Sequence, residues 1–137
     1  MKNQIVLLLL LTCVFTGSIY AKPPKKQKES PTTLGMVIYS NDVETVWNAL
    51  RLANYSSNQG DSVSIFLLGK GVELDSMVKT NTDLKEQADK FLDNGGTILG
   101  CGTCLRSRNN KEPQVCKFSS LADLYAIVRK NKIVLTF

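Results

Sequence analysis

The sequence predicts a single α/β domain built on a mostly parallel sheet with helices on both faces. Two observations lead to this class. Short apolar runs rich in β-branched and aromatic residues alternate along the chain with amphipathic segments of helical spacing. The chain has 137 residues, of which 43% are apolar and 21% charged, which is a globular composition at a length that suits one domain.

The first half of the predicted domain contains two strands around one helix. Residues 34–39 (LGMVIY) form an apolar run that predicts a buried strand. Ser40, Asn41 and Asp42 can cap a helix, and apolar residues then recur at helical spacing, which predicts a helix over 42–58. Residues 62–68 (SVSIFLL) predict the second strand, and the GKG sequence after it predicts a loop.

The second half repeats this alternation. A helix is predicted over 82–93, and Asn94-Gly95-Gly96 ends it as a left-handed cap. Residues 97–100 (TILG) predict a third strand that runs directly into a cysteine. Ser119 or Ser120 caps a last helix, and residues 132–137 (KIVLTF) close the chain as a strand.

Ligands and chemistry in open parallel sheets sit beyond the carboxyl ends of the strands. Three polar segments follow predicted strands and are therefore expected at that edge: residues 40–42, 69–73 and 101–104. The GKG loop alone is a weak indication of a phosphate site, because it lacks the full Walker spacing. Glu73 can be a proton acceptor near the cysteines or simply an exposed carboxylate.

The N-terminal 33 residues are expected to lie outside the fold. Lys2, an apolar run over 5–15 and a small residue at the end predict a signal peptide over 1–21. A membrane anchor is an alternative, although a spanning helix needs roughly 20 apolar residues. Lipidation of Cys13 is another, although Thr12 is unusual before a lipidated cysteine. Residues 22–33 (KPPKKQKESPTT) predict a basic Pro/Lys-rich tether. We therefore expect a periplasmic or otherwise extracytoplasmic protein.

Charge and composition exclude several classes of function. The chain carries a formal charge of +5, but residues 34–137 contain 12 basic and 11 acidic side chains, so the excess lies in the leader and the tether. A nucleic-acid ligand is not expected without a basic patch on the domain. The sequence has no histidine, which excludes His-dependent triads and zinc sites that need imidazole.

The most specific chemical motif is Cys101-Gly102-Thr103-Cys104, at the end of the third predicted strand. Backbone N–H groups at a strand end, together with Arg106, Arg108 and Lys70, can stabilise a thiolate there. Four interpretations compete: a structural disulfide, a three-cysteine metal site, a redox pair and a sulfur carrier that holds a persulfide. The motif comes too late in the chain for thioredoxin.

Cys116 is the third cysteine of the predicted domain. It can be a small buried apolar residue before the last helix, or a resolving or second carrier thiol. The metal interpretation would combine it with the CxxC pair, but three thiolates leave a zinc site one ligand short. Three cysteines cannot all pair within one chain, so at least one is free or bridges subunits.

Three motifs in order resemble the DsrE/DsrF-like sulfur-relay proteins. They are YSND after the first strand, FLLGKGVE after the second, and Gly-Cys-x-x-Cys after the third, and the likeness covers residues 34–137. The resemblance implies a three-layer flavodoxin-like (DsrEFH-like) fold with a central sheet of about five strands. It also implies a homo-oligomer, a trimer or hexamer, in which a cysteine carries sulfur as a persulfide without a cofactor.

This combination predicts a sulfane-sulfur carrier, of sulfurtransferase type if it is an enzyme, with a protein as sulfur donor or acceptor. Export and the extra cysteines depart from the best-known members of the family. A binding or assembly module with a Cys101–Cys104 disulfide, or a thiol–disulfide redox protein, are the alternatives. Membrane contact is expected only through the leader. No metal is expected, and the predicted chemical and binding residues are Cys101, Cys104, Cys116, Ser40, Asn41, Lys70, Gly71 and Arg106.

Overall fold

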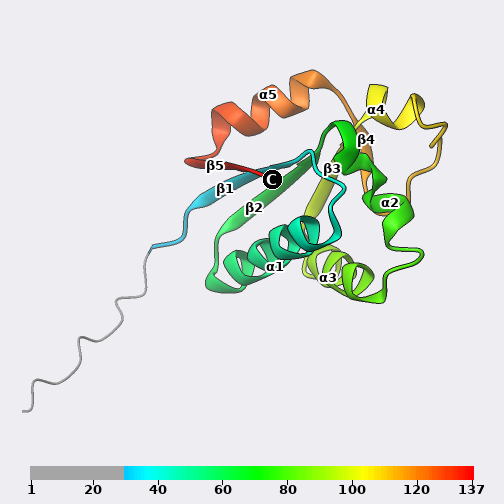
Figure 1. Ribbon diagram of the computed structural model, residues 1–137. Coiled ribbons are helices and arrows are strands. Elements are labelled where there is room, and N and C mark those ends of the chain that lie inside the picture. The colour runs from blue at the N-terminus through cyan, green and yellow to red at the C-terminus, as the bar shows by residue number, and fades with distance from the viewer. Residues whose placement is uncertain (1–29) are drawn as a thin grey trace, which may run out of the picture.

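The computed structural model describes residues 30–137 (Figure 1). The predicted signal peptide and most of the predicted tether lie outside these residues. A five-stranded sheet with the order β4-β3-β2-β1-β5 forms the middle layer, and every strand pair in it is parallel. This confirms the predicted fold class. The strands are β1 (Thr33–Ile38), β2 (Ser62–Leu67), β3 (Thr97–Cys101), β4 (Lys117–Ser119) and β5 (Ile133–Thr136).

Three helices cover the two faces of the sheet. Helices α1 (Val43–Gln59) and α3 (Thr82–Asp93) pack side by side on one face, and α5 (Leu121–Lys130) crosses the other (Figure 1). The strand order explains this distribution. The chain runs outward from β1 to β4, and right-handed crossovers place their helices on one face. It then returns to pair β5 with β1, which puts α5 on the opposite face.

The three long helices begin within a residue of the positions that the sequence predicts. Asp42 caps α1, because its carboxylate accepts the N–H of Thr45 at 2.8 Å. Asn81 caps α3 in the same way. Of the two candidate serines, Ser120 precedes α5, and its backbone N–H donates to the Asp123 carboxylate at 2.8 Å.

Four short elements differ from the prediction. The predicted GKG loop is the start of a 3₁₀ helix, η1 (Gly69–Glu73), which continues into α2 (Leu74–Met77). Helix α4 (Gly102–Arg106) and strand β4 also have no counterpart in the predicted pattern. Each is three to five residues long, so none of them shows the periodicity by which longer elements are detected.

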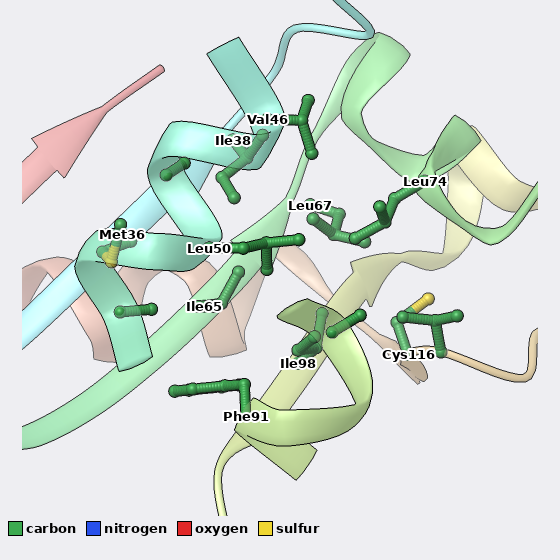
Figure 2. Packing of buried hydrophobic residues seen from close by; sticks show 14 of the residues in the cluster. Met36, Ile38, Val46, Leu50, Ile65, Leu67, Leu74, Phe91, Ile98 and Cys116 are labelled. Carbon is green, nitrogen blue, oxygen red and sulfur yellow. The ribbon is translucent and has the colours of Figure 1, made fainter. Parts of the chain in front are cut away.

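The core lies between the sheet and the α1/α3 layer (Figure 2). Alternate side chains of the central strands point into it, among them Met36, Ile65 and Ile98, and Leu50 and Phe91 meet them from the helices. All are fully or almost fully buried, and each contributes roughly 1.5–3 kcal/mol of transfer free energy. The core thus fixes β1, β2 and β3, which carry the candidate site. Within residues 30–137, none of the helices is both long and apolar enough to cross a bilayer.

Candidate functional site

The carboxyl ends of β1, β2 and β3 lie next to one another. Ile38 is in register with Leu67, and Leu67 with Gly100, so the segments that follow these strands begin at the same edge of the sheet. Gly71 allows the closest approach there: a Cβ on this residue would lie 2.0 Å from the carbonyl oxygen of Ile38. The structure therefore brings together residues 40–42, 69–73 and 101–104, as the sequence predicts.

Cys101 ends β3 and is the N-cap residue of α4. Its Sγ accepts the backbone N–H of Cys104 at 3.4 Å, in the position where a serine or aspartate oxygen usually caps a helix. Both thiols are free and half-buried, and they pack against the edge of the core. Neither is enclosed in hydrocarbon, so both can meet a reactant.

The second thiol of the motif is shifted by its surroundings. Burial raises the pKa of the Cys104 thiol above its ordinary value, and the neighbouring Cys101 thiol raises it further. The N–H of Gly69 and the positive charge of Arg108 oppose this effect. The raised pKa keeps Cys104 in its thiol form near neutral pH, while its backbone N–H donates to the Cys101 sulfur at 3.4 Å.

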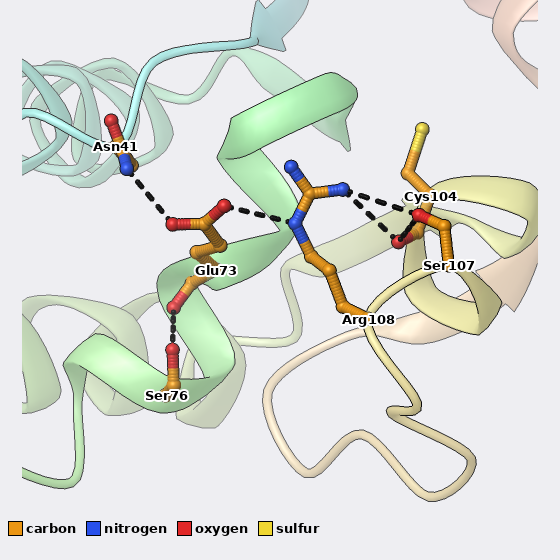
Figure 3. A network of polar contacts seen from close by, with 6 residues as sticks. All are labelled: Asn41, Glu73, Ser76, Cys104, Ser107 and Arg108. Atoms are coloured by element: carbon orange, nitrogen blue, oxygen red, sulfur yellow. Dashed lines mark hydrogen bonds and ion pairs between the residues drawn. The ribbon is translucent and has the colours of Figure 1, made fainter.

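A polar network links the loops beside the cysteines (Figure 3). The Glu73 carboxylate accepts hydrogen bonds from Asn41 Nδ2 at 2.8 Å and from Arg108 Nε at 2.9 Å. These two contacts, with the Asn41 contact the larger, hold the pKa of Glu73 below its ordinary value. Arg108 Nη1 donates in turn to the carbonyl oxygen of Cys104 at 3.2 Å. Residues after β1, β2 and α4 are thus joined to the backbone of the cysteine motif.

The other predicted binding residues have different surroundings. Ser40 lies at the same edge, where its Oγ accepts the N–H of Asp42 at 3.0 Å. Lys70 is exposed on η1, and its charge contributes to lowering the pKa of Glu73. Arg106 is exposed and makes a single side-chain contact, to Thr103 at 3.4 Å. A small cavity of about 230 Å³ lies beside the network, lined by Val72, Glu73, Ser76, Leu105, Arg108 and Asn110.

Cys116 has an environment opposite to that of the pair. It is 6% exposed and belongs to the core, where its Sγ would lie 2.6 Å from a Cβ on Gly100 (Figure 2). Burial, with a smaller effect from the Asp75 carboxylate, raises the pKa of Cys116 to about 12. Of the two interpretations of this residue, the geometry favours the small buried side chain.

Asp75 fixes the segment that leads to Cys116. This carboxylate is 3% exposed and accepts the backbone N–H groups of Gln114 at 2.6 Å and Val115 at 2.9 Å. It also accepts Nδ2 of Asn110 at 3.0 Å. The loop between α4 and β4 is therefore tied to α2 by a satisfied buried acceptor. Among residues 30–137, no cluster of three or more potential ligands is arranged to hold a metal.

The fold and the site together define a class: a parallel α/β domain with two adjacent thiols at the carboxyl edge of its sheet. The chain belongs to the DsrE/DsrF-like family, whose model matches residues 33–137. An uncharacterized protein of Methanocaldococcus jannaschii, MJ0989, is 29% identical over 100 residues, which are 69% of this chain and 88% of that protein. The resemblance of the three motifs to this family is thereby confirmed.

Two solved structures share the fold. The crystal structure of the ychN protein from E. coli superposes with a TM-score of 0.68 at 17% identity, over 79% of this chain and 100% of that one. BT1422 from Bacteroides thetaiotaomicron, a conserved protein of unknown function, has a TM-score of 0.65 at 19% identity, over 77% and 95% of the two chains. At these identities the likeness establishes the fold alone.

Sequence reasoning named Arg108 and Glu73 as nearby charges but did not select them as site residues, and it did not single out Asp75. Arg106 and Arg108 look equivalent in the sequence, being two residues apart after the same motif. Only the short α4 and the turn after it decide which arginine turns toward Cys104. Because α4 has no periodic signature, the sequence contains no signal that separates the two.

Proposed function

We propose that this protein is a sulfane-sulfur carrier that holds sulfur as a persulfide on Cys101. The observation that supports this most directly is the pair of free, half-buried thiols at the carboxyl edge of the sheet, where Cys101 Sγ accepts the backbone N–H of Cys104. Membership of the DsrE/DsrF-like family supports the same chemistry. We assign the nucleophile to Cys101 because its sulfur caps α4 and accepts the backbone N–H of Cys104, whereas burial raises the pKa of the Cys104 thiol.

The loading step is a transfer between sulfur atoms. The Cys101 thiolate attacks the outer sulfur of a donor persulfide, R–S–SH. A bond forms between Sγ and that sulfur, the R–S bond breaks, and its electron pair leaves with the thiolate R–S⁻. The product on the protein is Cys101–S–SH, so atoms and charge balance without an external oxidant or reductant.

Release can proceed in two ways from the same arrangement. An acceptor thiolate can take the outer sulfur by the reverse of the loading step, which regenerates the Cys101 thiolate. Alternatively, Cys104 attacks Sγ of Cys101 as a thiolate, which forms the Cys101–Cys104 disulfide and expels HS⁻. The second route oxidises the two thiols and reduces the sulfane sulfur to sulfide, so a dithiol reductant must then reopen the disulfide.

Intact-mass measurement of the reduced protein after incubation with polysulfide tests the carrier function. We expect a gain of one or more sulfur atoms that a dithiol removes. Cys101→Ser should abolish the gain, and Cys104→Ser should retain it with slower release as sulfide. Cys116→Ala is the matched control and should load normally. A protein that gains no sulfur in any variant, or that loads on Cys116, would contradict the proposal.

The same contact favours thiol–disulfide exchange as a second candidate. Two cysteines separated by two residues can close a disulfide, and the backbone N–H of Cys104 already donates to Cys101 Sγ at 3.4 Å. Titration against glutathione and dithiothreitol buffers separates this function from a structural staple. Reversible closure in the range of exchange proteins supports redox chemistry, whereas a bridge that resists reduction supports an assembly module.

We also propose that the protein assembles with copies of itself. An apolar stripe on α5 is exposed, with Leu121 at 77%, Tyr125 at 65% and Val128 at 49% of their full accessible areas. Phe118 of β4 is 42% exposed and would contact a Cβ on Gly102, so it stands beside the cysteine motif. Sedimentation equilibrium of the wild type and of Leu121→Ser/Tyr125→Ser tests this, and a monomeric wild type would refute it.

Location outside the cytoplasm is proposed on the leader-like residues 1–21 alone. Cell fractionation of the full chain with a C-terminal tag tests this proposal, and N-terminal sequencing of the product shows whether cleavage follows Ala21. A full-length product in the cytosolic fraction would contradict it.

A further inference from the structure

We infer that Arg108 is a positioning residue of the cysteine site. Its guanidinium is fixed by Glu73, holds the carbonyl oxygen of Cys104 and keeps a positive charge near the second thiol. The effect of Arg108 on sulfur release rests on the proposed function, in which Cys104 expels the sulfur from Cys101. The effect of Arg108 on the reactivity of Cys104 can be tested without any sulfur donor.

The guanidinium is held at two sides. Nε donates to the Glu73 carboxylate at 2.9 Å, and Nη1 donates to the Cys104 carbonyl oxygen at 3.2 Å and to Ser107 Oγ at 3.4 Å (Figure 3). Glu73 is anchored in turn by Asn41 at 2.8 Å. The planar fork of an arginine can make these contacts at once, whereas the single ammonium of a lysine cannot.

The position of this charge matters because burial works against Cys104. Desolvation raises the pKa of the Cys104 thiol, and the positive charge of Arg108 is one of two influences that lower it. The Arg108 and Glu73 side chains are 33% and 32% exposed, so water screens the charge only in part. Neutralisation of Glu73 by Arg108 also prevents a bare carboxylate from opposing thiolate formation next to the motif.

Arg106 supplies a matched control within the same segment. It lies two residues earlier, carries the same charge and makes one side-chain hydrogen bond, to Thr103 at 3.4 Å, with none to Glu73 or to the Cys104 carbonyl. Any effect of net charge alone should be shared by the two arginines. An effect of the fixed guanidinium should belong to Arg108.

The experiment measures the rate of Cys104 alkylation by iodoacetamide as a function of pH, in a Cys101→Ala background and read by peptide mass. Cys116 is a second readout on the same sample. We expect Arg108→Gln to slow alkylation near neutral pH by about threefold to tenfold, because loss of the positive charge raises the pKa of Cys104 further and leaves less thiolate. Arg106→Gln should change the rate by less than about twofold.

Two further measurements keep the test decisive if Arg108→Gln folds poorly. Arg108→Lys retains the charge without the fork, and we expect an intermediate rate. Added salt should slow the alkylation of Cys104 in the arginine-containing protein but not in Arg108→Gln, where the charge left near the thiol is the Glu73 carboxylate and salt weakens its opposition to thiolate formation. Equal rates for the Gln variants at 106 and 108, or a rate in the arginine-containing protein that does not respond to salt, would overturn the inference.

These experiments can reject the role of Arg108 and the proposed carrier function independently of each other. A protein that takes up no sulfur, yet shows the Arg108 effect on alkylation, would reject the carrier function and retain the positioning role. If sulfur loads on Cys101 and leaves as sulfide at the same rate in Arg108→Gln as in Arg106→Gln, the carrier function stands. The role of Arg108 is then refuted.

Discussion

The three cysteines of the domain occupy two regions with opposite physical character. Cys101 and Cys104 lie half-buried at the carboxyl edge of the sheet, where backbone N–H groups and the Arg108 guanidinium surround them. Cys116 lies in the core among apolar side chains, with the Asp75 carboxylate as its nearest charge influence. In the first region, donors and a positive charge offset part of the effect of burial on Cys104, whereas in the second both burial and the Asp75 carboxylate oppose a thiolate at Cys116. The comparison shows that position in the fold, and not residue type, decides which thiol can react.

The largest expected difference concerns reactivity. In the folded protein, Cys116 should be alkylated at least about a hundredfold more slowly than the faster thiol of the pair, because it reacts only after local opening and as a minor thiolate. Iodoacetamide labelling at neutral pH, followed by peptide mass, measures the ratio. The three rates should converge in denaturant. Rapid labelling of Cys116 in the native protein would show that its thiol is as reactive as those at the sheet edge.

A substitution at Asp75 should make the segment that buries Cys116 open more often. Asp75→Asn turns one acceptor oxygen into a donor that must face either the two backbone N–H groups or the Asn110 amide, so we expect a loss of about 2–4 kcal/mol of unfolding free energy. Alkylation of Cys116 should accelerate while that of the pair changes little. Urea titration and labelling measure the two effects. Asp83→Asn, on exposed α3 surface, is the control.

The raised pKa of Cys116 predicts a dependence of stability on pH. A thiol whose pKa rises from the ordinary 9.0 to about 12 on folding stabilises the native state below pH 9 and loses that contribution between pH 9 and 12. Within this window the slope is about 1.4 kcal/mol per pH unit for one group. Cys116→Ala should lose less unfolding free energy than the wild type between pH 9 and 12. Identical alkaline profiles for the two proteins would show that Cys116 titrates normally.

The smallest expected effect lies in the network beside the pair. The lowered pKa of Glu73 means that its contribution to stability is present above pH 4.5 and is lost as the pH falls through its folded value. Because the ion pair with Arg108 is about one-third exposed, we expect less than about 1 kcal/mol. Unfolding of Glu73→Gln and wild type at acid pH should converge. If the wild type still has the higher unfolding free energy at low pH, the difference does not come from the ionised Glu73 carboxylate.

The sequence predicts most of the fold because long elements carry their own signals. Apolar runs mark β1 and β2, helical spacing marks α1, and Asp42 and Asn94-Gly95 mark helix ends. The short elements η1, α2, α4 and β4 carry no such signal, since three to five residues cannot display a period. Strand β4 exists because it pairs with β3, from Leu99 to Cys101.

By itself, the sequence determined an α/β domain of the DsrE/DsrF-like family with a CxxC motif at the end of its third predicted strand. These features depend on local propensity and on the order of segments along the chain. Tertiary structure alone decided that Arg108 and not Arg106 turns to Cys104, that Glu73 neutralises it, and that Cys116 is enclosed. The reason is physical: burial and charge at a sulfur atom arise from neighbours 35 to 40 residues away in the chain, such as Glu73 for Arg108 and Asp75 for Val115.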